Sequence, residues 1–449
     1  MDFCTAPSVP ADRSLRREVL RLLRLAMPMM AAQGGLILMG VVDTLVIGRV
    51  SALEMGAVAL GNTISSVSIV LGLGLVMGIE PLVSQAHGAG ESERTRHFLW
   101  QGGWLALWVA GPLVLLMAVL LGILVPIGVE PELVGITNTY VFARMIGVPF
   151  NALYGAARSY LTSIERTRPI LFAVLIANLV NGVLDLWLVF GLGWGALGVG
   201  LATSGCWMLM FAIVARAAWM AESSRVSSRQ MVLTDVWKIA RLGLPIGLQL
   251  GAEVGVFALV SVLIARFGEV VLAGHHIAIT LASLAFMSGV GLAVASATRV
   301  GMYVGAERSD LARRSGGIAM MLGGVLLACI GVIYGLFSVR IAHLFAPNEP
   351  DVVIAGAAFL RIAAVFSLSD GVQVVAAGAL RGAGDTLTPL WANLAAHWAI
   401  GLPMALFLGH GLGLGAVGYW WGLTLGLTVT ALWLALRFER LTRRAVARV

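Results

Sequence analysis

Charged residues are scarce in this sequence: they make up 12% of the 449 residues, whereas 59% of the residues are hydrophobic. A soluble protein carries about 25% charged residues. The mean hydropathy of +0.93 leaves too little polar surface for a soluble enzyme or for a groove that binds nucleic acid. We therefore expect a protein that is surrounded by membrane lipids and binds no nucleic acid.

Cysteine is scarce as well, and the spacings of common catalytic and metal sites are missing. Cys4, Cys206 and Cys329 are too few and too scattered for a disulfide framework or a metal knuckle. The glycine-rich stretch Gly72–Gly78 lacks the Gly-Lys-Ser/Thr ending of a phosphate loop, so close helix packing is the better interpretation. We therefore expect neither an enzyme nor a bound cofactor.

Long apolar stretches dominate the chain instead. Each is about 20 residues long, enough to cross a hydrocarbon core of ~30 Å. Twelve such stretches begin near Leu25, Met55, Leu99, Leu133, Pro169, Gly195, Leu242, Val271, Gly316, Val353, Leu390 and Leu412. The predicted fold class is an all-α polytopic membrane protein with twelve transmembrane helices.

The formal charge of +7 is carried almost entirely by arginine, because Lys238 is the only lysine. Positive residues beside spans remain in the cytoplasm. All basic residues fall on one side of the predicted membrane except Arg49, Arg144, Arg266, Arg340 and Arg361. We therefore expect both termini in the cytoplasm and the chain in the bacterial inner membrane.

The two halves of the chain repeat each other, and one register holds over most of the first two spans of each half. Corresponding pairs include Arg24 and Arg241, Pro28 and Pro245, Arg49 and Arg266, Gly88-Ala89 and Gly305-Ala306, and later Gly191–Gly198 and Gly411–Gly418. Six spans per half is an even number, so the halves share one orientation. This predicts two six-helix lobes related by pseudo-two-fold symmetry along the membrane normal, which is typical of transporters.

The repeat also divides the chain. The predicted parts are a cytoplasmic N-terminal arm (1–24), an N-lobe with helices 1–6 (25–220), a cytoplasmic linker (221–241), a C-lobe with helices 7–12 (242–436) and a basic cytoplasmic tail (437–449). Pro28 and Pro245 lie in the first span of each lobe and are hinge candidates, although a proline kink can equally be a static bend.

Acidic residues inside the spans are the strongest functional signal, since an ionised side chain at the bilayer centre costs at least ~2.5–3.5 kcal/mol. They are Asp43, Glu80, Asp185, Glu253 and Asp370. No arginine or lysine is expected at comparable depth. An interior with acids but no basic partners suits protons, Na⁺ or organic cations.

In the N-lobe, Asn181 and Asp185 are four residues apart and share a helix face. The helical rise places Asp43, Asp185 and Thr203 at similar depths, ~9–12 Å from the outer side. Their oxygens predict a site for Na⁺, or an acid pair that shares a proton. Alternatively, Asn181 and Thr203 only hydrogen-bond to neighbouring helices.

In the C-lobe, the expected depths of Glu253 and Asp370 disagree, because Asp370 lies ~25 Å from the outer end of its expected span. Either that span is kinked or starts later, or the two acids act separately. Among other residues, His275 and His276 are a pH-sensing pair or interfacial packing residues. His397 is interpreted as a core residue, and Glu80 as a snorkelling or capping residue.

Several motifs together resemble the multidrug and toxic compound extrusion (MATE) family. They are Met39–Gly48 around Asp43, Pro81–Gly90, Asn181–Asp185 and Ala377–Asp385. Leu250–Phe257 and Ser369–Ala376 are similar to the NorM-like branch. The resemblance covers nearly the whole chain.

The resemblance implies an antiporter that exchanges H⁺ or Na⁺ for cationic or amphiphilic compounds by alternating access, and we expect a monomer. It implies a cation site at Asp43, Asn181, Asp185 and Thr203, and a second coupling or substrate site at Glu253 and Asp370, with Na⁺ at either set. Glu80 departs from the pattern, because Gly78-Ile-Glu-Pro is closer to eukaryotic members.

Two other functions remain as alternatives. A lipid-linked precursor flippase of a related branch also has two lobes, but it should contain buried arginines and often extra spans. A membrane enzyme or receptor is the second alternative, but the sequence has neither a nucleophile or metal constellation nor a soluble sensing domain.

Overall fold

The computed structural model describes residues 14–221 and 229–449, and this part of the chain is helical without strands. Cys4, Arg13 and Arg225 lie outside the described residues. Twelve helical segments in this part are long and apolar enough to span a membrane, as predicted. They are Leu15–Ile47, Ala52–Gly88, Ser92–Leu124, Pro131–Ser163, Arg168–Gly191, Gly195–Met220, Leu233–Ala265, Glu269–Gly305, Ser309–Leu336, Pro350–Gly382, Leu387–Gly411 and Ala416–Thr442. The all-helical membrane fold class is therefore confirmed.

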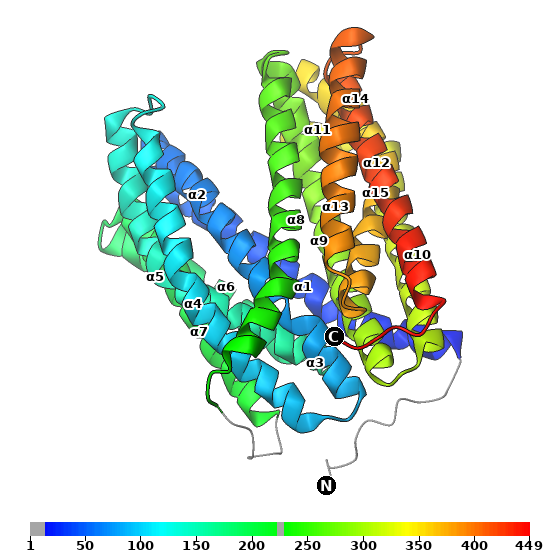
Figure 1. Ribbon diagram of the computed structural model, residues 1–449. Coiled ribbons are helices and arrows are strands. Elements are labelled where there is room, and N and C mark those ends of the chain that lie inside the picture. Colours follow the sequence, from blue (N-terminus) through cyan, green and yellow to red (C-terminus); the bar gives the residue numbers. More distant parts are fainter. Residues whose placement is uncertain (1–13, 222–228) are drawn as a thin grey trace. The chain divides into compact units, whose positions relative to one another are not determined.

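The described residues form two units, which are described separately (Figure 1). Unit 1 is Ala31–Gly247, and unit 2 is Leu248–Val449 with the described part of Val9–Met30. Unit 1 contains α2 (Ala52–Val76), α3 (Ile79–Gly88), α4 (Ser92–Leu124), α5 (Pro131–Ser163), α6 (Arg168–Asp185), η1 (Leu186–Gly191) and α7 (Gly195–Met220). Unit 2 contains α9 (Glu269–Gly305), α10 (Ser309–Leu336), α11 (Ser338–Phe345), α12 (Pro350–Gly382), α13 (Leu387–Asn393), η2 (Leu394–Gly401), α14 (Leu402–Leu406), η3 (Phe407–Gly411) and α15 (Ala416–Thr442).

Two helices contribute residues to both units. The unit boundary falls after Met30 in α1 (Leu15–Ile47) and after Gly247 in α8 (Leu233–Ala265). Each boundary lies two residues after a proline inside the helix, Pro28 in α1 and Pro245 in α8. The hinge candidates Pro28 and Pro245 therefore lie beside the unit boundary within each helix.

The first helix begins at Leu15, whereas the first span was expected near Leu25. Arginine is a good helix former, so the arginines of this segment do not interrupt the helix. A buried ion-pair cluster also holds the segment in unit 2. Glu18 accepts hydrogen bonds from Arg299 (3.2 and 3.0 Å), Tyr303 (2.9 Å) and Ser315 (2.7 Å). Residues 15–24 are thus packed helix, and α8 likewise starts at Leu233, before the expected Leu242.

The sequence repeat recurs as a repeat of packing. In unit 1, α5 packs against α2, α4 and α7; in unit 2, α12 packs against α9, α10 and α15. Matching loops use matching glycines, because Gly193 and Gly195 have φ of 69° and 49°, and Gly413 and Gly415 have φ of 68° and 58°. These left-handed conformations favour glycine. Each loop follows a π-helical segment, η1 or η3.

The glycines at the end of α2 bring two helices together in unit 1. A Cβ at Gly74 would collide with the backbone of Gly247 in α8, and one at Gly78 with the carbonyl of Ile239. Close helix packing therefore explains the stretch Gly72–Gly78.

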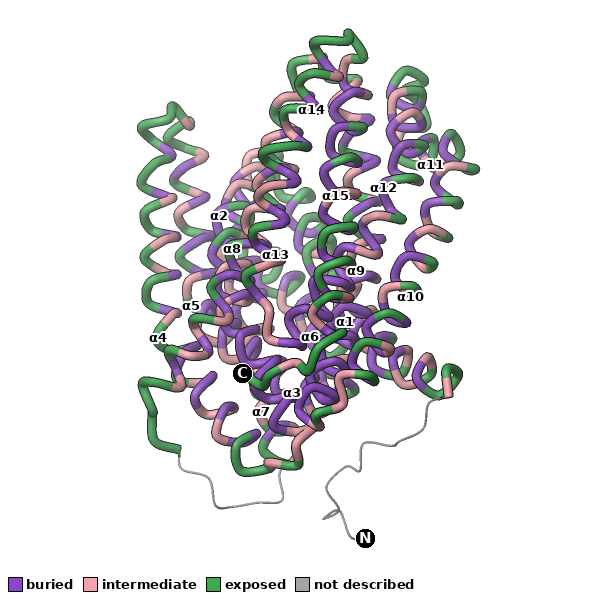
Figure 2. Tube along the Cα trace, turned by 45° about the vertical axis from the view of Figure 1, so that its right-hand side comes forward, coloured by how far each residue is buried: buried purple, intermediate pink, exposed green. Residues whose placement is uncertain are grey.

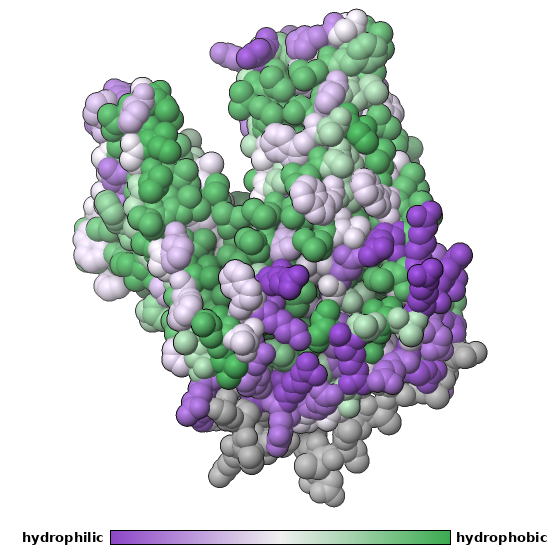
Figure 3. Space-filling view, in the orientation of Figure 1, coloured by the Kyte–Doolittle hydropathy of each residue, from purple (hydrophilic) through white to green (hydrophobic). Residues whose placement is uncertain are grey.

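Burial differs between helices. Figure 2 shows long buried stretches in α9 and α12, whose C-terminal halves carry continuous runs of buried residues. Large apolar side chains are exposed on the outer helices, among them Leu179 in α6 (74%) and Val325 in α10 (56%). Figure 3 shows that hydrophobic residues cover much of the visible surface of each unit, as lipid contact requires.

Candidate functional site

The four predicted N-lobe residues come together in unit 1. Asp43 lies on α1, Asn181 and Asp185 on α6, and Thr203 on α7, and all four are buried. The Thr203 hydroxyl is 3.0 Å from Asp43 Oδ2 and from the Val199 carbonyl, to which it can also donate. Asp185 is the last residue of α6 before η1, and π-helical turns of this kind are frequent at functional sites.

Two carboxyl groups of like charge form the centre of this N-lobe cluster. Asp43 and Asp185 lie close enough to interact electrostatically. The two carboxyl groups also interact electrostatically with the Tyr140 hydroxyl and the Cys206 thiol. Asp43 Oδ1, both carboxyl oxygens of Asp185 and both amide atoms of Asn181 are buried and have no hydrogen-bond partner among the described residues. Buried polar atoms are rarely left unpaired, so these oxygens form a set of ligands suited to a cation or a shared proton.

The predicted C-lobe acids also lie near each other, in unit 2. Glu253 on α8 and Asp370 on α12 are 7% and 4% exposed, and they interact electrostatically. The two side chains therefore lie near each other, although the depths expected for them from the sequence differ. Counting residues from a helix end measures distance along the helix axis, and the ends of α8 and α12 need not lie at one level. The structure therefore brings the two acids within range of electrostatic interaction, whatever their separate or joint role.

Amide side chains complete this C-lobe cluster, and no sequence motif singles them out. Asn393 Nδ2 donates to Glu253 Oε2 at 3.4 Å, and Gln373 forms a further side-chain hydrogen bond with Glu253. Gln373 follows Asp370 by three residues on α12, a spacing that places both on one helix face and that would have identified it. His397 is buried with Nδ1 3.3 Å from the Asn393 carbonyl, while its Nε2 has no partner among the described residues.

One arginine contradicts the expectation that no basic residue lies deep in a span. Arg144 was placed on the outer side, but it lies in the interior of α5 and is 7% exposed. Its guanidinium carbon is 6.0 Å from the centre of the Tyr140 ring. A span that starts near Leu133 would place Arg144 close to a loop. The helix instead extends from Pro131 to Ser163, and the helix face that carries Arg144 is buried.

His275 is a satisfied core residue. Trp420 Nε1 donates to His275 Nδ1 (3.2 Å), so the ring proton is assigned to Nε2, which donates to Ser261 Oγ (2.8 Å). The Ser261 hydroxyl in turn donates to the Phe257 carbonyl (2.9 Å). A second proton on Nδ1 would face the Trp420 N–H, so this network favours the packing interpretation over a pH sensor.

Glu80 is also buried, at 5% exposure, and therefore does not snorkel. It lies in the first turn of α3, where a carboxylate interacts favourably with the helix dipole. Ser159 of α5 donates to its Oε1 at 3.4 Å. No side-chain capping hydrogen bond is present at the start of α3, so the interaction with the helix dipole is what remains of the capping interpretation.

Comparison with known proteins places this chain in a family. The MatE family model matches residues 28–187 and 245–407, once in each half. Multidrug resistance protein MdtK of Proteus mirabilis is 33% identical over 446 residues, covering 96% of this chain and 97% of that protein. Multidrug resistance protein NorM of Aliivibrio fischeri is 32% identical over 441 residues, covering 95% and 96%.

Among solved structures, the eukaryotic MATE transporter AtDTX14 shares the fold with a TM-score of 0.85, at 23% sequence identity and with 96% of this chain and 98% of that chain covered. The resemblance seen in the motifs is thus confirmed, and the relatives are transporters, not enzymes. The matches extend over both halves, and the chain therefore belongs to the MatE family of multi-pass membrane transporters.

Proposed function

We propose that this protein is a cation-coupled efflux antiporter of the bacterial inner membrane that exports cationic and amphiphilic organic compounds in exchange for H⁺ or Na⁺. The names of its relatives as multidrug resistance proteins support multidrug export, and they favour it over the lipid-linked precursor flippase. The basic excess on one side supports cytoplasmic termini. Each candidate cluster lies within one chain, which supports a monomer.

The observation that carries the coupling mechanism is the buried pair of Asp43 and Asp185, whose oxygens accept a hydrogen bond from no described residue except Thr203. A proton shared by the pair, or Na⁺ held by its oxygens with Asn181 and Thr203, reduces the repulsion between the two carboxylates. An organic cation competes for the same negative charge. Bound ion and bound substrate thereby favour different arrangements of the lobes, which is the coupling that exchange requires.

Glu253 and Asp370 provide a second negative cluster with a different set of neighbours, the amides of Gln373 and Asn393. We assign this cluster to substrate or to a second coupling ion. The unit boundaries beside Pro28 and Pro245 support a hinge role for these two prolines, because proline removes one helix hydrogen bond and permits bending there.

The test is transport of a fluorescent permanent cation into proteoliposomes under an imposed pH or Na⁺ gradient, with H⁺ and Na⁺ movement recorded by separate dyes. We expect Asp43→Asn and Glu253→Gln each to lower ion-driven transport by about tenfold or more, because a charge-assisted interaction is lost. Asp351→Asn, at an exposed position in the first turn of α12, is the control and should transport normally. Normal ion-driven transport by both Asp43→Asn and Glu253→Gln would contradict the acid-based mechanism.

A further inference from the structure

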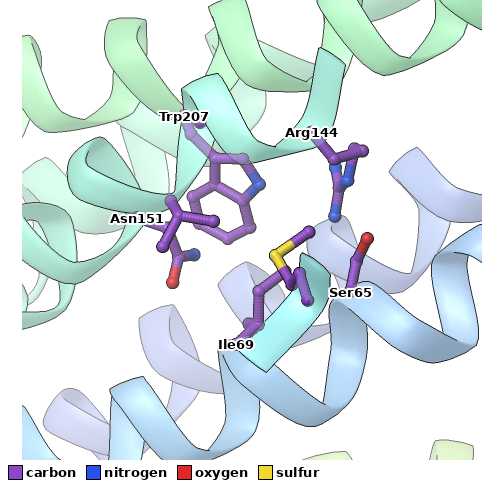
Figure 4. Close-up of a pocket in the computed structure, with 8 residues that line it drawn as sticks. Ser65, Ile69, Arg144, Asn151 and Trp207 are labelled. Carbon is purple, nitrogen blue, oxygen red and sulfur yellow. The ribbon is translucent and has the colours of Figure 1, made fainter. Parts of the chain in front are cut away.

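Arg144 and Arg229 both belong to unit 1 and form no ion pair with any described residue, but the space around them differs. Arg144 lines a crevice with Ser65 and Trp207 (Figure 4), and this crevice leaves no room for a water molecule. Arg229 is exposed, in the segment that leads into α8. A ligand of unit 1 can therefore reach Arg229 but not Arg144.

The guanidinium group of Arg229 contacts two tryptophan rings. Its central carbon is 5.1 Å from the centre of the Trp100 ring on α4 and 4.7 Å from that of the Trp219 ring on α7. The two rings meet edge to face, with their centres 6.1 Å apart. Aromatic contacts stabilise a guanidinium charge without using its N–H groups as hydrogen-bond donors. Arg229 is therefore held in place while its donors stay available.

Hydrogen bonds from α4 fix the backbone around Arg229. Trp104 Nε1 donates to the Arg229 carbonyl at 3.0 Å. One residue along, Gln101 Nε2 donates to the Gln230 carbonyl at 2.8 Å, and Gln101 Oε1 accepts from the Val232 N–H at 2.8 Å. Gln101 and Trp104 are three residues apart and share a helix face. This segment is therefore held along α4, and a ligand that binds there does not have to order it first.

The groups around Arg229 are donors without acceptors. Trp100 Nε1 is buried and has no hydrogen-bond partner among the described residues, and an indole N–H can only donate. Arg216 is exposed and lies three residues before Trp219 on α7, so the two share a helix face. Asp235 is the only acidic residue between positions 229 and 241, and it pairs with His97 at 2.7 Å. A ligand that satisfies these donors must bring negative charge and several acceptor oxygens.

The surroundings of these donors are those of a membrane surface. Trp104 and Trp108 on α4 are exposed, and so is Met220 at the end of α7, at 67%. Tryptophan at the end of a span lies at the level of the lipid headgroups. Basic residues between the ends of spans bind anionic lipid headgroups. The donors therefore lie where a headgroup can reach them, on the side that we propose is cytoplasmic.

We propose that Arg229, Arg216 and Trp100, here called the Arg229 site, bind the phosphate of an anionic phospholipid in the adjacent leaflet. A phosphate offers several acceptor oxygens, and its geometry matches the planar guanidinium fork. The acyl chains lie along the exposed apolar faces of α4 and α7. An anionic lipid fits better than a zwitterionic one, because the latter adds a cation close to the two arginines. The site goes beyond the proposed export function and does not depend on it.

The experiment measures the affinity of the purified full chain in detergent for dioleoyl phosphatidylglycerol by native mass spectrometry. Dioleoyl phosphatidylcholine is the zwitterionic comparison lipid, and ionic strength is kept constant. We expect Arg229→Gln and Arg216→Gln each to weaken phosphatidylglycerol binding about fivefold, because each arginine near a headgroup contributes about that factor. Binding of phosphatidylcholine should change less than about twofold. Trp100→Phe keeps a ring for Arg229 but loses the N–H, and it should weaken phosphatidylglycerol binding about threefold.

Arg168→Gln is the matched control. Arg168 is an exposed arginine at the start of α6, in the same unit, and its substitution removes the same charge. It should change phosphatidylglycerol affinity less than about twofold. Equal losses in Arg168→Gln and Arg229→Gln would show that the lipid responds only to the overall basic charge, and would overturn the site. A wild type that binds both lipids equally well also overturns it. If millimolar inorganic phosphate displaces phosphatidylglycerol from the wild type, the site binds free phosphate and the inference is wrong.

Discussion

Removal of the Glu18 carboxylate should destabilise unit 2 more than any substitution on the exposed helix faces. Glu18 is 8% exposed and Arg299 is 4% exposed, so neither charge is stabilised by water. Glu18 accepts four hydrogen bonds, two from Arg299 and one each from Tyr303 and Ser315. In Glu18→Ala, Arg299 loses its carboxylate partner and stays buried, because α9 packs closely against α12.

The expected magnitude follows from the desolvated charge. Removing one partner of a buried ion pair costs about 3–5 kcal/mol. For a unit of roughly 150–250 residues, each kcal/mol lowers Tm by about 2–4 °C, so Glu18→Ala should lower Tm by about 6–20 °C. The assay is thermal unfolding of the purified protein in detergent, followed by the loss of the monodisperse peak in size-exclusion chromatography.

Two further variants make this prediction specific. Asp351→Ala removes an exposed carboxylate and should change Tm by less than about 2 °C. The double variant Glu18→Leu with Arg299→Met replaces the pair by apolar side chains, and it should recover most of the loss because no buried charge is left unpaired. A Glu18→Ala protein whose Tm falls no further than that of Asp351→Ala would refute the reasoning.

Two other predictions concern packing. Gly243→Ala should lower the stability of unit 1, because the new Cβ would collide with the Leu75 carbonyl. Gly111→Ala has open space around the new Cβ and should stabilise its helix by about 0.5–1 kcal/mol. Equal Tm values for the two variants would contradict this packing. His275→Phe removes both hydrogen bonds of the ring and should cost about 1–3 kcal/mol, without changing the pH dependence of transport. A shifted pH profile in His275→Phe, with His276→Phe as the control at an exposed position, would show that the ring titrates after all.

The membrane fold could be predicted from the chain because the bilayer imposes a simple one-dimensional rule. A span needs about 20 apolar residues, so hydropathy alone identifies each span and the repeat divides them into halves. The proximity of the four N-lobe residues could also be predicted from the sequence. Asn181 and Asp185 share a helix face by spacing, and Asp43 and Thr203 were placed at the same depth by the helical rise.

Helix ends were less predictable, since α1 and α8 both begin earlier than expected. Hydropathy identifies the part of a helix that lies in lipid. The helix itself can extend further where its residues form hydrogen bonds or packing contacts with other helices. The Glu18 cluster supplies such partners, and it joins residues that are up to 297 positions apart in the chain. No local pattern reports a contact of that kind.

Composition, spacing and periodicity thus determined by themselves that this protein spans a membrane with two related sets of helices and buried acids. Only the tertiary structure decided that Glu253 lies near Asp370 and that Arg144 is buried among helices rather than close to a loop. The physical reason is that a span's length and amphipathic face are encoded locally, whereas the depth and neighbours of a side chain depend on how whole helices pack against one another.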